Sequence, residues 1–486
     1  MRLHLLAAAT ALTLALAGCA SSGGLHPDGT PIDPSTLKAG QSLADVARSD
    51  TWPSTDWWTG LHDDQLNALI AEALQDNPGL GVADARARAA QAEAGAANAD
   101  RAPTLNAGGS VSGARIPTTV MPEDAGGGHF AVAKYANLSF NWGLDLWGGK
   151  RAAWQAAVGA SQAAEVDARA ARIELSANVA RAYVQLGYAF TQQDLAEAEL
   201  KRAGDARELT RQRVDAGLDN QIQLKQGDAE VASAEQSVAL AKRAVDAARS
   251  SLSVLLGKGP DRGLQIERPA TLKPAELAVP ADLPLELLGH RADLVAARWR
   301  VEAADKNIKA AKTEFMPNIS IGAMAGVVNM GGGNPFTLPA RFYQLGPSIS
   351  LPIFDGGRLR ANLAGKDAQY DLAVAQYNQT LVGALNQVAD ELSALQWLEQ
   401  QIAAQHRALD AAQQAWDLAE QRYKAGVGSY LEALSVRQQL LAAERATASL
   451  EAQQVDLSVQ LIQALGGGFQ PQADAPELSS SQPSRS

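Results

Sequence analysis

The stretch RYKAGVGSYLEAL, Arg422 to Leu434, interrupts a long run of sequence that otherwise reads as uniform helix. A second stretch, RVDAGLDNQIQLK from Arg213 to Lys225, lies 209 residues earlier and places an arginine, an Ala-Gly pair and a branched apolar residue in the same order. Helices often end at glycine, because glycine adopts a left-handed backbone without steric cost. We therefore expect Gly217 and Gly426 to mark the tips of two helical hairpins.

The runs that lead to these tips contain no proline. None occurs between Glu123 and Gly259, or between Ile353 and Gln470. The 66 residues from Lys150 to Asp215 would extend about 100 Å as one helix, which is longer than a single globular core. Alanine and glutamine recur along these runs, and small side chains let helix backbones approach closely. This pattern predicts a thin wall of long helices.

The chain contains an internal repeat. A shift of 214 residues aligns the beginnings of the two halves without a gap and brings Pro103 onto Pro317, and a shift of 209 aligns their ends. The loop length between the two aligned segments absorbs the difference. Two homologous halves therefore span residues 61–264 and 285–469, joined by a linker at 265–284. Each half is expected to contain a helix, a strand pair and a long helical hairpin, and the first helix is predicted at Leu66 to Asp100 in one half and at Leu285 to Glu314 in the other.

Sequence with a period of two follows the matched proline in each half. The expected strands lie at Thr104 to Gly113, Ala136 to Trp147, Asn318 to Ala325 and Gln344 to Ile353, each with one apolar face and one small or polar face. About ten residues suffice for a tilted strand to cross a bilayer, although a soluble sandwich shows the same alternation. Four strands cannot close a barrel alone, so a membrane location requires several chains, and three chains are the smallest number expected to leave a conduit.

The N-terminus has the pattern of a secretion signal. One early positive charge, an apolar stretch and small residues precede the only cysteine, Cys19. The tetrad LAGC resembles a bacterial lipoprotein signal, which implies cleavage after residue 18 and a lipid on the cysteine. Ala20 and Ser21 are not acidic, which in such lipoproteins implies the outer membrane. Residues 19–60 are then a lipidated linker, and residues 470–486 are expected to be disordered.

Composition excludes several classes of function. The net charge of -11, without a block of basic residues, argues against nucleic-acid binding. The six histidines are scattered, and HExxH, GxSxG and Walker A motifs are absent from the sequence. We therefore expect neither an enzyme nor a cofactor-binding or metal-binding protein.

Several stretches together resemble the TolC-like outer-membrane efflux channel family, in particular its lipidated members of the NodT type. They are LAGC at 16–19, DWWTGLHDDQLNALIAEALQDNPGL at 56–80, AAKTEFMPNISI at 310–321, LPIFDGGRLRA at 351–361, and RYKAGVGSYLEAL with the closing ALGGGF. The resemblance implies an α+β membrane protein in which a homotrimer forms a 12-stranded outer-membrane β-barrel, four strands from each chain, continuous with a periplasmic α-helical barrel. It also implies export of drugs or other small molecules, with a periplasmic adaptor and an inner-membrane transporter as partners.

The resemblance further implies that the hairpin tips form a periplasmic gate. Tyr423 matches a tip tyrosine, and Glu432 matches a position that is acidic in some members, where three carboxylates around the axis would favour cations. Charge patterning alone gives an equal alternative for Glu432, a solvated charge on a helix face. The chain departs from the family at Gln223 and Ser435, where members often have aspartate, and a hydrogen bond between Tyr423 and Gln223 is chemically possible.

Two further residues of the tips matter for the gate. Asp219 lies in the first tip and is an additional candidate, and Gly428 replaces an arginine that some members use to lock the closed state. The closed state is therefore expected to depend on fewer or weaker links.

The alternative to a channel is a lipid-anchored periplasmic scaffold or adaptor, but such a protein needs no duplicated strand pairs.

Overall fold

The computed structural model describes residues 23–37, 52–274, 283–330 and 333–470. The expected signal peptide and Cys19 lie outside the described residues, as does nearly all of the tail. The described residues belong to two compact units. The first contains the strands and parts of four helices, and the second contains both hairpin tips.

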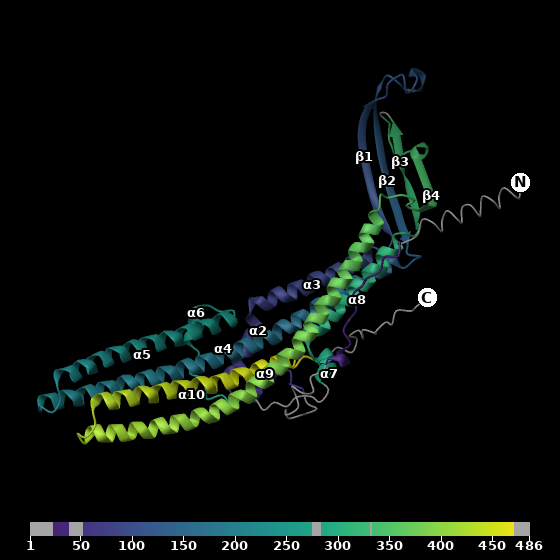
Figure 1. Ribbon diagram of the computed structural model, residues 1–486. Helices are drawn as coiled ribbons and strands as arrows, with labels where there is room; N and C mark the ends of the chain where they lie inside the picture. Colours follow the sequence, from purple (N-terminus) through teal and green to yellow (C-terminus); the bar gives the residue numbers. More distant parts are fainter. Residues whose placement is uncertain (1–22, 38–51, 275–282, 331–332, 471–486) are drawn as a thin grey trace. The chain divides into compact units, whose positions relative to one another are not determined.

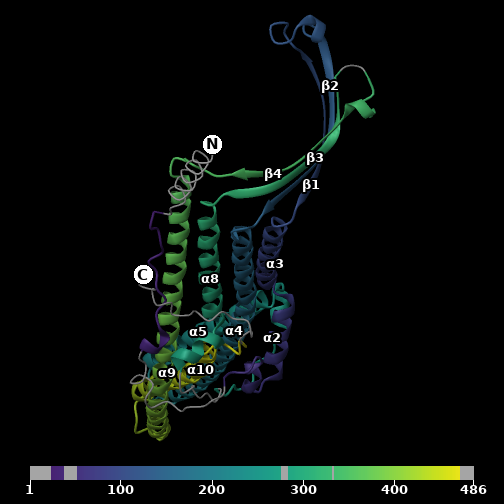
Figure 2. The ribbon, with the colours of Figure 1, turned by 90° about the vertical axis from the view of Figure 1, so that its right-hand side faces the viewer.

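One antiparallel sheet forms the strand part of the first unit (Figure 2). Its strands are β1 (Thr104–Arg115), β2 (Phe130–Leu144), β3 (Asn318–Met330) and β4 (Arg341–Ser350), paired in that order. All four strands predicted from the period of two are present, although β2 begins six residues earlier than predicted and β4 ends at Ser350 rather than Ile353. The two halves of the chain meet in this sheet, because β2 of the first half pairs along its length with β3 of the second.

The sheet leaves large apolar side chains uncovered. Every residue of β1 is exposed, and Leu345 and Ile349 of β4 are 76% and 71% exposed. The strands of the described residues form this one four-stranded sheet. Its two edges, β1 and β4, are unpaired in one chain. An apolar sheet with open edges requires both a hydrophobic surrounding and partner strands.

The helices that precede the strands are shorter than predicted. A single helix was expected from Leu66 to Asp100 and another from Leu285 to Glu314, whereas each is divided into two. The four helices are α2 (Asp64–Asp76), α3 (Pro78–Ala99), α7 (Leu283–His290) and α8 (Ala292–Thr313). In the first pair Pro78 forces Asn77 into an extended conformation, with ψ of 121°, and then begins α3 at its first position.

Four long helices form the hairpins (Figure 1). They are α4 (Gly149–Asp215), α5 (Gln221–Leu255), α9 (Arg358–Lys424) and α10 (Tyr430–Ala464). Both long helices of the second half begin and end 209 residues after their counterparts, which confirms the repeat. A helix of 67 residues is about 100 Å long. Among the described helices, none combines the length and hydropathy that crossing a bilayer requires.

Short helical elements complete the described chain: α6 (Pro260–Leu264), η1 (Pro34–Thr36), η2 (Trp57–Leu61), η3 (Glu123–Ala125) and η4 (Leu338–Ala340). The main core of the second unit includes large apolar side chains from α2, α4, α5 and the segment after α6. Its fully buried members include Leu66, Ile70, Leu186, Leu252 and Ile266. Tyr183 lies among them and donates its hydroxyl to Asp63. This core packs the helices of the hairpins together at the ends opposite the tips.

Candidate functional site

Both hairpin tips are built in the same way, as helices that end in left-handed glycine. Gly217 has φ of 71°, and the amide of Leu218 donates to the Arg213 carbonyl at 2.8 Å. The second tip repeats this pattern around Gly426, with φ of 75°. These are Schellman motifs, which satisfy the last carbonyls of the ending helix and turn the chain sharply. The glycines singled out in the sequence thus occupy the predicted tips.

A Gly426→Ala variant is expected to loosen the second tip. No atom lies within 4 Å of an added Cβ, so the cost arises from the left-handed backbone alone, about 1–2 kcal/mol. Hydrogen exchange of the tip amides in the intact protein should accelerate roughly 5- to 30-fold. Gly204→Ala is the control, because that helical glycine has equal space and no left-handed backbone. Equal exchange in both variants would contradict the assignment.

The helices after the tips begin with side-chain caps. In the first tip, Asn220 accepts from the amides of Ile222 and Gln223, while the Gln223 side chain accepts from the Asn220 amide at 2.8 Å. This is a capping box, which fixes the start of α5. In the second tip, Ser429 caps the amide of Glu432 at 3.1 Å. The side-chain carbonyl oxygen of Gln223 therefore accepts a hydrogen bond within its own turn.

The two tips are joined through Tyr423, whose side chain is only 6% exposed. Its hydroxyl lies 3.2 Å from Thr210 Oγ1 and donates to Asp219 Oδ2 at 3.2 Å. Asp219 also accepts from Arg213 Nε at 2.8 Å, and the guanidinium lies 5.0 Å from the centre of the Tyr423 ring. These four side chains, which we call the tip lock, connect α9 to α4 and to the first turn.

The tip lock gives the tyrosine partners other than Gln223, with which the sequence made a hydrogen bond chemically possible. Within the described chain, Tyr423 bonds to Thr210 and Asp219, and the possible bond to Gln223 is not made. Burial raises the pKa of Tyr423, and the Asp219 charge acts in the same direction against the opposing Thr210 contact. The phenol therefore remains protonated at neutral pH and serves as the donor.

A second group of polar side chains crosses the hairpins further from the tips. Arg437 of α10 donates to Glu199 of α4 at 2.8 Å and contacts Glu444 at 3.3 Å. Arg202 of α4 binds both Glu199 and Glu230, at 2.6 Å each. Glu199 and Arg437 are about one-tenth exposed. We call these five residues the ion network; no sequence pattern pointed to it.

Aromatic rings pack directly against the ion network. The guanidinium groups of Arg202 and Arg437 each lie 5.8 Å from the Trp416 ring centre. Tyr430, at 4% exposure, donates its hydroxyl to Glu230 at 3.0 Å and packs edge-on against Tyr423. The ion network and the tip lock are therefore adjacent layers of one contact between the two hairpins.

The remaining candidate gate residues face solvent. Glu432 lies in the first turn of α10, is half exposed, and lies 3.8 Å from Arg422 Nε. Ser435 is exposed one turn further along. Gly428 packs so closely against Arg422 that an added Cβ would lie 3.0 Å from its Cβ. An arginine at residue 428 would need this turn to rearrange.

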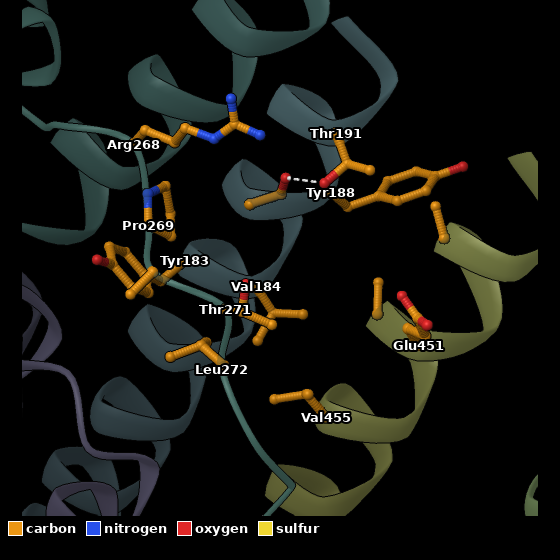
Figure 3. A pocket seen from close by; sticks show the side chains of 14 residues that line it. Tyr183, Val184, Tyr188, Thr191, Arg268, Pro269, Thr271, Leu272, Glu451 and Val455 are labelled. Atoms are coloured by element: carbon orange, nitrogen blue, oxygen red, sulfur yellow. Dashed lines mark hydrogen bonds between the residues drawn. The ribbon is translucent and has the colours of Figure 1, made fainter. Parts of the chain in front are cut away.

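Two cavities on the described surface lie in the hairpin unit, and the side chains that line them form no reactive constellation. One, of about 380 Å³, lies beside the tip lock and is lined by Trp416, Tyr423 and Tyr430. The other, of about 150 Å³, lies between α4, the segment after α6 and α10 (Figure 3). Two of its polar side chains are engaged structurally: Arg268 pairs with Asp194, and Thr191 bonds to its own helix.

A membrane-type sheet of four strands, duplicated rod-length hairpins and linked glycine tips define the class of outer-membrane channels. The family model described as "Outer membrane efflux protein" matches residues 69–258 and 283–467. The chain belongs to this family. It is an outer-membrane efflux channel that extends into the periplasm, and it is not an enzyme.

Individual relatives agree over most of the chain. FusA, the fusaric acid resistance protein of Burkholderia cepacia, is 37% identical over 74% of this chain and 69% of its own length. The multidrug resistance outer membrane protein MdtP of Escherichia coli K12 is 30% identical over 94% of this chain and 95% of its own. The crystal structure of VceC from Vibrio cholerae has a TM-score of 0.80 and 36% identity, covering 86% of this chain and all of that one.

Proposed function

We propose that three copies of this chain form the exit duct of a tripartite efflux pump. Channels of this family are trimeric and work in tripartite pumps. The open edges β1 and β4 support the proposal, because three four-stranded sheets joined edge to edge make a closed 12-stranded barrel. The relatives named for fusaric acid resistance and multidrug resistance point to small organic molecules as the cargo.

The proposed gate is the pair of hairpin tips, held closed by the tip lock. The observation that carries this proposal is the buried contact of Tyr423 with Asp219 and Thr210, which crosses from one hairpin to the other. The apolar cluster at the tips is small, with Tyr423, Tyr430 and Ala433 as its buried members, so the few polar contacts contribute strongly to the position of the second hairpin. Breaking them lets the α9–α10 hairpin move away from α4 and α5.

The partners would meet the chain at its tips and at its N-terminus. Four large apolar side chains are exposed at the two tips: Leu218, Ile222, Val427 and Leu431. Exposure of apolar surface to water is unfavourable, and a group of such side chains often marks an interaction site. Such a surface suits docking of a periplasmic adaptor, which would connect the channel to an inner-membrane transporter. A lipid on Cys19 would anchor the chain to the outer membrane.

Planar-bilayer recording of the purified trimer tests the proposed duct. We expect small, steady single-channel currents from wild-type protein, and larger currents when Tyr423→Phe removes the hydroxyl that joins the hairpins. Size-exclusion chromatography with light scattering establishes the number of chains in the same sample. A monomeric protein that carries no current in either form would favour the non-conducting scaffold.

The charge at Glu432 is expected to set ion preference at the tips. Three carboxylates around a narrow axis attract cations, so Glu432→Ala should lower the cation-to-anion permeability ratio by about twofold or more. Reversal potentials in a salt gradient measure this ratio. Glu420→Ala is the control, because Glu420 is also exposed near the tip and pairs with Lys424. An unchanged ratio in Glu432→Ala would leave that carboxylate as a solvated surface charge.

A further inference from the structure

The segment from Gly23 to Pro31, which we call the strap, lies against α9 in the first compact unit. The amides of Asp28 and Gly29 both donate to Asp371 Oδ1, at 2.9 and 2.7 Å. A Cβ on Gly29 would lie 3.0 Å from the Asp371 Cα and 3.2 Å from the Val374 Cβ. The strap therefore contacts the helix at van der Waals distance, closer than a residue with a side chain would allow.

A second contact of the strap lies nearer the start of α9. Leu25 packs against a cluster that includes Ile308 and Phe315 next to Leu363 of α9. Leu363 and Asp371 are eight residues apart and share one helix face, with Asp367 between them. The strap thus packs on a cluster that includes Leu363, one turn before Asp367, and bonds to Asp371, one turn after it. Asp367 accordingly lies beneath the strap.

Asp367 is an unusual carboxylate for this position. It is 5% exposed, and neither of its carboxylate oxygens has a hydrogen-bond partner among the described residues. Burying an unpaired charge is strongly unfavourable, whereas a neutral carboxyl group is tolerated far better. This residue has no part in the tip lock or the ion network.

The charged and titratable groups that face Asp367 come from three elements. Lys312 lies on α8, Asp371 on α9, and His26 and Asp28 on the strap. Burial is the main cause that raises the pKa of Asp367; the charges of Asp371 and Asp28 add to it, and Lys312 and His26 oppose it. The docked strap therefore favours the protonated carboxyl group.

We propose that Asp367 is a proton-binding site beneath the strap, and that proton uptake there tightens the strap on α9. The proton comes from solvent and binds a carboxylate oxygen, which removes the repulsion of Asp367 by Asp371 and Asp28. Since the docked state binds this proton more tightly than the undocked state, docking is strongest in acid and weakens as pH rises through the docked value. The N-terminal segment that follows Cys19 is thereby attached more firmly at low pH.

Hydrogen exchange of the full-length protein in detergent tests this proposal. The readout is the protection of the Asp28 and Gly29 amides, expressed relative to an unstructured peptide at the same pH. For wild-type protein we expect protection at least about threefold higher near pH 5 than near pH 8. Asp367→Asn should show high protection that hardly changes with pH. Equal pH profiles for wild type and Asp367→Asn would overturn the proposal.

Two further variants separate Asp367 from its surroundings. His26 is exposed and lies 3.7 Å from Asp28; His26→Gln removes this contact and should retain most of the pH dependence. Lys312→Gln removes an opposing positive charge and should extend the high-protection range toward neutral pH. A profile abolished by His26→Gln and unaltered by Lys312→Gln would assign the effect to the histidine and contradict the proposal. None of these variants touches the tips, so the outcome is independent of the gate.

Discussion

Replacing Arg437 by alanine is expected to separate the two hairpins more than any other single change considered for this chain. Arg437 is 8% exposed and binds two carboxylates, Glu199 on α4 and Glu444 on its own helix. Without Arg437, Glu199 keeps only Arg202 as a partner. Glu444 loses its only cationic partner within the ion network. Losing one partner of a buried ion pair costs about 3–5 kcal/mol, because the remaining charge stays desolvated.

The measurement for Arg437→Ala is thermal unfolding of the purified trimer, together with its single-channel current. We expect a lower unfolding temperature and larger, noisier single-channel currents. The reason is that the contact between α10 and α4 in the ion network, next to the tip lock, is lost. Arg422→Ala is the matched control: Arg422 is 56% exposed, and its carboxylate partner Glu432 lies 3.8 Å away. An exposed pair of this kind is worth about 0–1 kcal/mol. Similar changes in both variants would show that the ion network has no special role.

Replacing Asp219 by alanine is expected to open the gate. The carboxylate is 6% exposed and accepts from both Arg213 and Tyr423. Without it, the Tyr423 hydroxyl keeps only Thr210, and the half-buried Arg213 loses its counter-charge. A cost of about 2–4 kcal/mol to the closed state corresponds to a roughly 30- to 1,000-fold shift toward the open state.

Single-channel recordings at neutral pH measure this shift as open probability. The matched control is Asp215→Ala, which removes another carboxylate from the same tip. The Asp215 side chain is 69% exposed and lies 3.9 Å from Arg211. The open probability of Asp215→Ala should remain close to that of wild type. If Asp219→Ala conducts like Asp215→Ala, the contact between Tyr423 and Asp219 does not hold the tips closed.

Much of the fold could be predicted from the sequence because the relevant signals are local. Alternating strands, proline-free runs and left-handed glycines each depend on neighbouring residues, and the internal repeat doubled every signal. The predicted helix from Leu66 to Asp100 failed for an equally local reason. The prediction placed Pro78 inside one continuous helix, whereas this proline is the first residue of α3. Proline is favoured at the first position of a helix, so it marks the start of a new one.

The site was less predictable, because its contacts depend on how separate helices are placed in register. Tyr423 was identified, but its partner is Asp219, a turn residue, rather than Gln223 on the following helix. The position of Asp219 follows from the Schellman turn at Gly217 and not from helical periodicity. The ion network was missed for the same reason, since Glu199 and Arg437 are 238 residues apart. Charged residues within alanine-rich helices were the only available hint.

The internal repeat has an evolutionary consequence for the tip lock. By the 209-residue offset, Tyr423 corresponds to Val214 and Asp219 corresponds to Gly428. The bond between the hairpins therefore joins two positions that are not equivalent, and each copy lacks the residue that the other supplies. An ancestor with one hairpin per subunit would have had to carry tyrosine and aspartate in every copy. Gene duplication allowed the copies to diverge, so that one hairpin supplies the donor and the other the acceptor.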